Sequence, residues 1–496
     1  MNIALFLQMA AEACPNRCAL THDGSNYSYS ELHTAAKCAA NKFLRSECKF
    51  VSLIGESSPA VPIALMGAAM AGIPYVPINY RLSEKQILEL LARIDPVYLI
   101  TENSQLSDLS SHRILQKSNN FLADVFEDNE PELNCDEDPS AIAVQLFTSG
   151  TTGNPKAAIL RHEHLVSYIL GSVEFMSALE EEATLVSVPP YHIAGISALM
   201  SSIYACRHII QLPNFDPAEW LRLCSRERVT SAFLVPTMLI RVMETLSNSD
   251  YDQSSLESLK SIAYGGGKMP LPIIEQALAK FPNVSFTNAY GLTETSSTIT
   301  LLNPEDHREA MASNDDEIRA RLCSVGKPLP SIQLEIRGEY GEQLDALETG
   351  EIYVRGPQVS GEYQGFNVLK NDGWFPTRDS GYIDKYGFLY LAGRADDVIV
   401  RGGENISPGE IEDLMHRHPV IRDVAAVGIP SEEWGEAIAL AVVLVKEAKL
   451  TEEEISSHIQ QHLRSSRVPE VIRFYSDLPY NETGKLMRRI ISEWFT

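Results

Sequence analysis

Short apolar runs rich in β-branched residues alternate with helical patterns through most of this 496-residue chain. Glycine or proline punctuates these runs before the helical pattern resumes. A strand, a turn and a helix, repeated many times, is typical of a mostly parallel sheet covered by helices. We therefore expect strands at 50–55, 75–78, 97–101, 142–147, 183–190, 208–212, 231–236, 261–267 and 284–290, with a helix around 59–71.

The pattern changes twice towards the C-terminus. Residues 331–400 hold closely spaced strands with glycine turns, including the run DVIVRGG, which indicates an antiparallel β subdomain. Beyond about residue 397, helical patterns at 408–419 and 451–466 flank two strands and predict a compact α+β unit. A chain of this length is too long for a single core. We expect an α/β fold with a large N-terminal domain, 1–395, and a small C-terminal domain, 396–496.

The overall charge narrows the choice of partners. The sequence has 41 basic and 66 acidic residues, a net charge of −25, which argues against general binding of nucleic acid or of an anionic membrane. Eight scattered cysteines indicate reduced thiols, and the most apolar run, 61–78, is broken by glycine and proline. We expect no membrane-spanning segment and no signal peptide, and hence a cytoplasmic protein.

One loop is unusually rich in hydrogen-bond donors and free of carboxylates. Residues 148–156 read TSGTTGNPK and follow the apolar run 141–147. Backbone N–H groups, hydroxyls and a lysine in such a loop can surround phosphates. The loop is not a Walker A sequence, which would place Ser or Thr after the lysine. Taken alone, it is also consistent with a flexible turn.

Further motifs give the loop a family context. TSGTTGNPK resembles the phosphate loop of the AMP-forming acyl-adenylating enzymes: acyl-CoA synthetases, aryl-CoA ligases, firefly luciferase and peptide-synthetase adenylation domains. Other signatures of that superfamily follow in the same order, namely PYHIAG (190–195), YGGGKMP (264–270), NAYGLTET (288–295), GWFPTRDSGYID (373–384), GRADDVIVRGGENISPGEIE (393–412) and NETGKLMRR (481–489). AGIPYVPINYRL (71–82) extends the resemblance towards the N-terminus.

The resemblance implies an acid–thiol ligase that uses ATP, Mg²⁺ and CoA. A carboxylate attacks the α-phosphate of ATP, pyrophosphate leaves, and a thiol then attacks the acyl-adenylate. Both reactants are anionic, so donors and cations must stabilise the charge on the phosphate. The family pattern assigns the phosphate contacts to Thr148, Ser149, Gly150, Thr151, Thr152 and Lys156, the metal to Glu294, and the α-phosphate contact to Thr293.

The same resemblance implies the nucleoside contacts. Asp379 is expected to accept from the ribose hydroxyls, with Arg394 beside it. Adenine is expected between Tyr290 and the glycines Gly265, Gly266 and Gly267, with Asn288, Ala289 and Asn405 completing the site. The family usually has Thr-Gly-Asp where this chain has Thr377-Arg378-Asp379. The additional side chain of Arg378 bears on the local shape of this loop, but not on the role of Asp379.

Two half-reactions at one carbonyl imply a mobile C-terminal domain. By resemblance, Lys485 is the lysine that stabilises the adenylation transition state as a positive point charge. Asp396 matches the hinge, where a few backbone dihedrals would rotate the small domain. Gly402 and Gly403 would then let the pantetheine arm pass close to the backbone.

The acid is less well defined than the reaction. The acyl pocket is expected near Tyr191, His192, Gly195, Val235, Met238 and Tyr264. The three glycines favour a long or bulky apolar group, so we expect a fatty acid, with an aryl or polycyclic acid as the alternative. An α-amino acid is disfavoured because Phe233 stands where a buried acidic residue would be expected.

Several alternatives remain open at this point. CoA is the expected acceptor, and the alternative is a separate carrier protein. The chain could instead be a nucleotide-binding regulator that has lost catalysis, since fold alone does not establish function. A luciferase-type oxygenase is a further alternative. The sequence leaves the oligomeric state open between monomer and homodimer.

Overall fold

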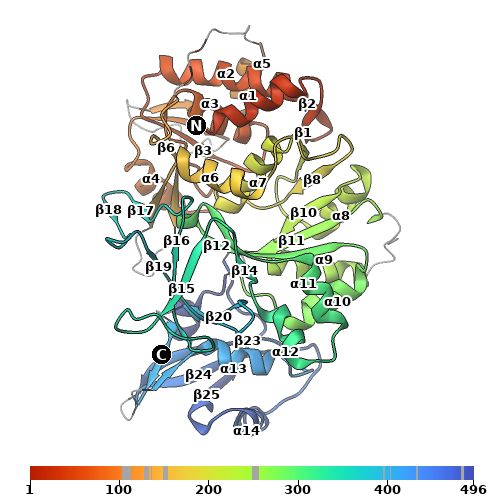
Figure 1. Ribbon diagram of the computed structural model, residues 1–496, viewed down its shortest axis with the longest axis vertical. Helices are drawn as coiled ribbons and strands as arrows, with labels where there is room; N and C mark the ends of the chain where they lie inside the picture. Colours follow the sequence, from red (N-terminus) through yellow and green to blue (C-terminus); the bar gives the residue numbers. More distant parts are fainter. Residues whose placement is uncertain are drawn as a thin grey trace.

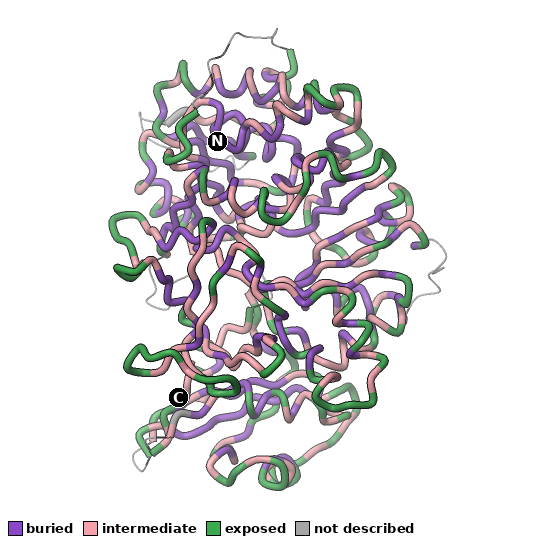
Figure 2. The backbone as a smooth tube through the Cα atoms, viewed as in Figure 1, coloured by how far each residue is buried: buried purple, intermediate pink, exposed green. Residues whose placement is uncertain are grey.

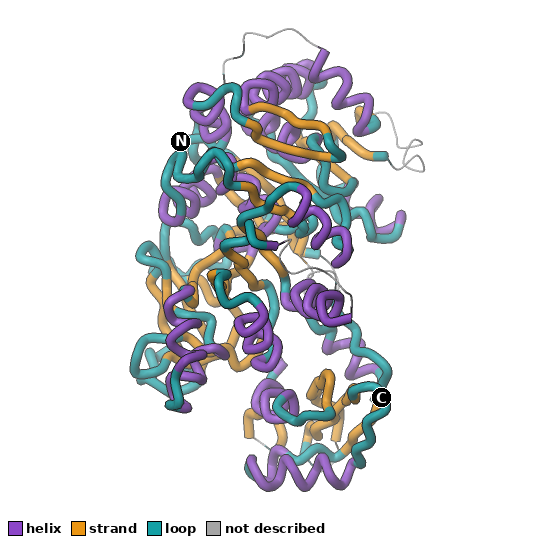
Figure 3. Tube along the Cα trace, turned by 90° about the vertical axis from the view of Figure 1, so that its right-hand side faces the viewer, coloured by secondary structure: helices purple, strands orange, loops and turns teal. Residues whose placement is uncertain are grey.

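The protein is described here by a computed structural model that covers residues 1–102, 113–127, 133, 135, 137–148, 155–248, 256–394, 397–402, 404–431, 434–481 and 485–495. The larger part of the chain fills the upper and middle region of Figure 1, and the C-terminal part lies below it. Seen from the side, the C-terminal part again lies at the lower end (Figure 3). The predicted α/β class with a large N-terminal and a small C-terminal domain is confirmed. The boundary at residues 395 and 396 lies outside the described ranges and stays a prediction.

The largest sheet in the described chain has the strand order β14-β13-β12-β11-β10-β8-β9-β1-β2. Its strands are β1 (Cys18–His22), β2 (Ser25–Ser28), β8 (Ala183–Val186), β9 (His208–Gln211), β10 (Ser231–Leu234), β11 (Ser261–Gly265), β12 (Ser285–Leu292), β13 (Ser297–Leu302) and β14 (Lys327–Pro328). Strands β1, β9, β8, β10, β11 and β12 pair in parallel. The predicted parallel sheet is therefore confirmed in this region.

Helices follow most of these strands, as the alternation predicts. They are α7 (Ile193–Tyr204), α8 (Pro217–Arg226), α9 (Pro236–Asn248), α10 (Leu271–Lys280), α11 (Pro304–Ala312) and α12 (Asp316–Arg319), and α6 (His162–Ser172) comes directly before β8. Local signals explain several starts: Asp216 caps α8 by accepting from the Glu219 N–H, and proline occupies the first turn of α8 and α11. The buried backbone runs through the middle of these layers, with exposed turns around it (Figure 2).

A second group of strands carries the glycine-rich loop. Parallel strands β3 (Phe50–Ile54), β4 (Val97–Thr101) and β5 (Arg113–Gln116) form one part. The other part is antiparallel: β6 (Ile142–Thr148), β7 (Lys156–Arg161), β17 (Glu362–Tyr363) and β18 (Phe366–Asn367). Tyr75 joins the two through bridges to Val51 and Val144. Strand β6 is followed by its antiparallel partner β7 and only then by α6, so the general alternation of strand and helix is interrupted here.

The N-terminal helices cover this second group of strands (Figure 1). They are α1 (Ala4–Ala13), α2 (Tyr29–Arg45), α3 (Ala60–Met70), α4 (Glu84–Leu91) and α5 (Ser118–Glu127). Every residue of α3 is buried, in agreement with the apolar helix expected around 59–71. Within the described ranges, no helix is both long and apolar enough to cross a membrane.

The predicted antiparallel subdomain is also confirmed. Strands β15 (Gln333–Arg337), β16 (Gly350–Arg355), β19 (Phe375–Ile383) and β20 (Leu389–Arg394) form a sheet in the order β15-β16-β19-β20. The run DVIVRGG was assigned to this subdomain, and that assignment is wrong. Its strand β21 (Ile399–Arg401) pairs with β22 (Glu404–Ile406) and β24 (Gly435–Leu444) of the C-terminal sheet, where Ile399 joins a separate apolar core.

The C-terminal part has its own sheet and cores. Strand β23 (Ile421–Ser431) pairs with β24 (Gly435–Leu444), and β25 (Val471–Phe474) lies parallel to β24. Helices α13 (Pro408–His416), α14 (Glu452–His462) and α15 (Arg488–Glu493) complete the unit. Thr451 caps α14 in a capping box with Glu454. Apolar residues on the two faces of the sheet form separate clusters, so the predicted α+β unit is confirmed.

Candidate active site

The two ends of the glycine-rich loop are fixed by strand pairing. Thr148 ends β6 and Lys156 begins β7, and the two residues are register partners. The Thr148 hydroxyl donates to the Lys156 carbonyl at 3.3 Å. Ser149, Gly150, Thr151 and Thr152 lie outside the described residues, so their phosphate contacts stay predictions. The strand pairing nevertheless fixes the two ends of the loop, Thr148 and Lys156, next to each other.

Lys156 lies next to two aromatic rings. Its Nζ is 5.7 Å from the ring centroid of Tyr363 and 5.9 Å from that of Phe366. These two rings stack on each other with centroids 4.9 Å apart. A lysine within about 6 Å of an aromatic face is attracted by the ring quadrupole. The rings therefore hold the ammonium group near the loop without neutralising its charge.

Glu294 lies in a tight turn between two strands of the large sheet. Strand β12 ends at Leu292, one 3-10 turn (Thr293–Thr295) follows, and β13 begins at Ser297. The Ser360 N–H donates to the Glu294 carbonyl at 2.9 Å, and the Gln358 side-chain amide donates to the Thr295 and Thr298 carbonyls at 3.0 and 2.7 Å. Thr293 opens this turn. The turn is thus held by the segment that leads into β17.

The side chain of Glu294 is 9% exposed and accepts a hydrogen bond of 2.5 Å from the Tyr363 hydroxyl at Oε1. Burial, followed by the nearby Glu294 charge, raises the pKa of Tyr363, so the phenol stays protonated and remains the donor. The described residues include no cluster of three or more metal-binding side chains. One carboxylate suits Mg²⁺, which keeps waters and takes phosphate oxygens.

Asp379 and Arg394 are brought together by the antiparallel sheet. They are register partners in β19 and β20, and Arg394 Nη1 donates to Asp379 Oδ1 at 2.7 Å. The Tyr290 hydroxyl donates to Asp379 Oδ2 at 2.6 Å. The Asp379 carboxylate is buried, and each of its oxygens keeps a further lone pair for a ligand hydroxyl. This geometry can hold a ribose, the role that resemblance predicts.

The Thr377-Arg378-Asp379 segment, where the chain departs from the family pattern, lies within β19 beside a register shift in its pairing with β16. Arg378 has a φ of 62°, in the left-handed region that favours glycine. Its side chain is 62% exposed and reaches Glu351 at 3.9 Å. The arginine therefore adopts the backbone conformation of the usual glycine, and Asp379 keeps its place on the strand.

The residues expected around adenine lie on two neighbouring strand ends. Gly265 pairs with Ala289, and a Cβ on Gly265 would lie 2.1 Å from the Ala289 carbonyl oxygen. Gly266 has a φ of 81°. The backbone itself therefore favours glycine at these two positions. This weakens the inference that the glycines are there to make room for a bulky acyl group. Asn288 is buried and donates to the Ser324 carbonyl at 3.1 Å, which leaves its Oδ1 as the acceptor for an amino group.

The acyl-pocket candidates are mostly buried. Tyr191, Gly195, Val235 and Met238 lie in the interior, and the Tyr191 ring packs against His192 with centroids 4.5 Å apart. Tyr264 is fully buried, and its hydroxyl lies 2.8 Å from His307 Nε2 of α11. The phenol of Tyr264 is thus already engaged in the core.

His192 precedes α7 as its N-cap and is electrically neutral. Burial and, second, the positive charge of Lys485 lower the pKa of His192 to about 4. Its Nε2 is buried and has no hydrogen-bond partner among the described residues. A neutral imidazole with a free nitrogen is suited to contact a reacting carboxyl group. The positive charge of Lys485, in the C-terminal part, thus acts on His192 of the large domain.

Lys485 of the C-terminal part is hydrogen-bonded to Asn481 in both directions. The Lys485 N–H donates to Asn481 Oδ1, and the Asn481 N–H donates to the Lys485 carbonyl, each at 2.8 Å. Across the domain contact, Lys268 forms an ion pair with Asp413 of α13, and the Ser407 hydroxyl donates to the Ala392 carbonyl. Helix α13 therefore helps to hold the C-terminal part against the glycine-rich end of β11.

Of the remaining predicted residues, which belong to the hinge and the C-terminal part, only some lie within the described ranges. Gly402 has a φ of 58°, and its N–H donates to the Trp434 carbonyl at 2.8 Å. Asn405 lies in β22, and nothing is described of its side chain. Gly403 and the hinge candidate Asp396 lie outside the described ranges. Arg401, which precedes Gly402, forms an ion pair with Glu470.

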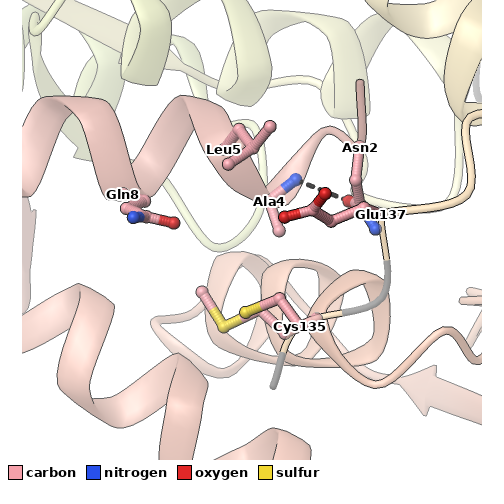
Figure 4. Close-up of a pocket in the computed structure, with 7 residues that line it drawn as sticks. Asn2, Ala4, Leu5, Gln8, Cys135 and Glu137 are labelled. Atoms are coloured by element: carbon pink, nitrogen blue, oxygen red, sulfur yellow. Dashed lines mark hydrogen bonds between the residues drawn. The ribbon is translucent and has the colours of Figure 1, made fainter. Parts of the chain in front are cut away.

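Sequence reasoning missed Gln358, Tyr363 and Phe366. They come from one segment that the tertiary fold places beside Glu294 and Lys156. The only sequence signal was an aromatic pair three positions apart in GEYQGFN (361–367). A hollow beside α1 is separate from this site: Asn2, Ala4, Leu5, Gln8, Met70, Cys135 and Glu137 line it (Figure 4).

The geometry defines a nucleotide-dependent enzyme of two domains, and comparison with known proteins gives its family. The model for the AMP-binding enzyme family matches residues 7–364, and the model for its C-terminal domain matches residues 410–485. The chain belongs to this family. It is an acid–thiol ligase of the AMP-forming class, and its relatives include a CoA ligase and a synthetase solved with ATP and magnesium ion.

Relatives with assigned activities are similar over nearly the whole chain. A 2-succinylbenzoate–CoA ligase of Bacillus cereus (strain Q1) is 30% identical, covering 98% of this chain and 97% of that protein. The o-succinylbenzoate CoA synthetase (MenE) of Bacillus subtilis, solved with ATP and magnesium ion, is 27% identical with a TM-score of 0.84, covering 98% of each chain. ATP-bound MatB from Rhodopseudomonas palustris is 25% identical with a TM-score of 0.88, covering 100% and 99%. ATP-dependent ligation of an acid to CoA is supported, and the expected fatty acid is not.

Proposed function

We propose that this enzyme adenylates an aromatic carboxylic acid and transfers the acyl group to CoA. The adenylation step is supported by the buried His192, whose pKa is lowered by burial and, second, by the positive charge of Lys485. Lys485 would stabilise charge on the α-phosphate as a positive point charge supplied by the small domain.

Each side of the site has a separate task in this proposal. Asp379 and Arg394 bind the ribose, with Tyr290 holding the carboxylate. Lys156 and the loop that it ends bind the β- and γ-phosphates, while Thr293 donates to the α-phosphate. Glu294 would hold Mg²⁺, which when bound neutralises phosphate charge and orients the oxygens. His192 orients the acid carboxylate through its free nitrogen.

Thioester formation requires a second arrangement of the same two domains. Lys485 would leave when the C-terminal part, residues 396–496, rotates about Asp396. Gly402 and Gly403 would then approach the pantetheine arm. CoA is the preferred acceptor because the relatives are named as CoA ligases, and a carrier protein is the alternative. We place the enzyme in the cytoplasm, which agrees with its eight free cysteines.

The aromatic acid follows from the similarity to 2-succinylbenzoate–CoA ligases. The test is pyrophosphate release with ATP and Mg²⁺ over a panel of aryl, fatty and amino acids, with and without CoA. We expect release with aryl acids and a thioester, detected by mass spectrometry, only when CoA is present. Release with fatty acids alone would overturn the acid class, and release without thioester would point to a carrier protein. Absence of release with every acid, together with absence of ATP binding, would overturn the proposal.

A further inference from the structure

Tyr363 lies between the two charged groups predicted to handle the triphosphate. Its hydroxyl donates to Glu294 Oε1 at 2.5 Å, and its ring centroid lies 5.7 Å from Lys156 Nζ. Among the described residues, no ion pair joins Lys156 directly to Glu294. One neutral side chain thus contacts both the cation and the carboxylate.

The backbone that carries Tyr363 is firmly attached on both sides. Tyr363 pairs with Ala158 of β7, the strand that leaves the phosphate loop. Its neighbour Glu362 accepts two hydrogen bonds from Arg161, at 2.8 and 2.9 Å. Three positions earlier, the Ser360 N–H binds the Glu294 carbonyl at 2.9 Å. The strand therefore fixes the distance between the loop and the turn that holds Glu294.

We propose that Tyr363 is a positioning residue that aligns the Glu294 carboxylate for the magnesium ion of the nucleotide and keeps Lys156 beside it. This inference rests on the proposed adenylation. A phenol donor occupies Oε1 and would leave Oε2 to bind a metal ion, whereas a cation in its place would neutralise the carboxylate. Partners of a metal ligand fix its orientation, and their loss commonly costs about 10- to 100-fold in metal affinity.

The phenylalanine variant separates the hydroxyl from the ring. Tyr363→Phe keeps the stack on Phe366 and the ring beside Lys156, and removes the donor to Glu294. We expect the Mg²⁺ concentration for half-maximal ATP binding, measured by isothermal titration calorimetry, to rise about tenfold. At saturating Mg²⁺, kcat should return to within about threefold of wild type, since the carboxylate itself remains.

Two controls separate alignment from general stability. Tyr390→Phe removes a tyrosine hydroxyl from Asp384, at 3.4 Å, away from the phosphate loop, and should leave the Mg²⁺ dependence unchanged. Phe366→Leu removes one ring beside Lys156 and keeps the Tyr363 hydroxyl. It should weaken ATP binding without a change in the Mg²⁺ midpoint. In the Glu294→Gln background, Tyr363→Phe should add little, because the aligned carboxylate is already lost.

The outcomes distinguish this inference from the proposed function. An unchanged Mg²⁺ midpoint in a folded Tyr363→Phe protein would overturn the positioning role while leaving adenylation intact. Fully additive effects of Tyr363→Phe and Glu294→Gln on that midpoint would also overturn it. Failure of the wild-type protein to bind ATP with Mg²⁺ would instead overturn the proposed function on which the inference rests.

Discussion

Arg488 donates two hydrogen bonds, of 2.5 and 2.8 Å, to the two carboxylate oxygens of the buried Glu412. Arg488 also donates to the Ala426 carbonyl at 2.7 Å. The pair joins α15 to α13 and to β23, three positions after Lys485 in the chain. The lysine predicted to act in adenylation is therefore anchored to the small domain through a buried ion pair.

Replacing Arg488 should destabilise the C-terminal domain. Arg488→Met leaves the Glu412 carboxylate buried without its cation, which costs about 3–5 kcal/mol. Chemical denaturation followed by tryptophan fluorescence measures the loss. The double variant Glu412→Leu/Arg488→Met removes both charges and should recover most of the stability. Equal stability of Arg488→Met and wild type would contradict the prediction that the Arg488–Glu412 ion pair stabilises the C-terminal domain.

The charge of Lys485 should be detectable at His192. Burial and, second, that charge lower the pKa of His192 to about 4, so Lys485→Ala should raise this pKa while leaving it below 6.5. An NMR titration of labelled histidines measures the change. Lys446→Ala, an exposed lysine of the same domain, is the matched control and should have no effect. An unchanged pKa in Lys485→Ala would mean that the two domains do not meet in this way in solution.

The neutral His192 also predicts a pH dependence of stability. The unfolded chain binds a proton at this residue below pH 6.5, whereas the folded protein does so only below about pH 4. Stability should therefore fall as the pH falls through this window, by up to about 1.4 kcal/mol per pH unit from this residue. Comparing the pH dependence of unfolding in wild type and His192→Asn isolates the contribution. Parallel curves for the two proteins would contradict it.

Glycine at position 378 should stabilise the fold. Arg378 has a φ of 62°, and a non-glycine residue in this region costs about 1 kcal/mol. Arg378→Gly relieves this cost and should raise the melting temperature in calorimetry. Arg378→Ala loses the same contact to Glu351 but keeps the backbone penalty, so it should bring no gain. A lower melting temperature for the glycine variant would show that the arginine contacts outweigh the strain.

Removing the Lys485 charge should separate the two half-reactions. Lys485→Ala should slow acyl-adenylate formation by about 100-fold or more, because a preorganised charge at the phosphate is lost. Thioester formation from CoA and a supplied acyl-adenylate should stay near the wild-type rate. Rapid-quench assays measure each step by itself. An equal loss in both steps would refute the rotation about Asp396.

Much of the fold could be read from the sequence. Strand and helix periodicities predicted the parallel sheet from β8 to β12, and the change after residue 397 predicted the separate C-terminal unit. The prediction failed where pairing depends on distant residues. The run DVIVRGG was assigned to the antiparallel subdomain, but its strand β21 joins the C-terminal sheet, because Arg401 pairs with the distant Gly435 of β24.

The sequence by itself determined the family and the chemistry that its motifs carry, since residue types such as the Glu294 carboxylate and the Lys485 amine set what a site can bind. The fatty acid was predicted from three consecutive glycines. In the structure, the backbone itself favours glycine at two of these positions, Gly265 and Gly266. Only the tertiary structure placed Tyr363 between Lys156 and Glu294. Contacts across more than sixty positions depend on the pairing of β17 with β7 and on the turn after β12, which no local pattern encodes.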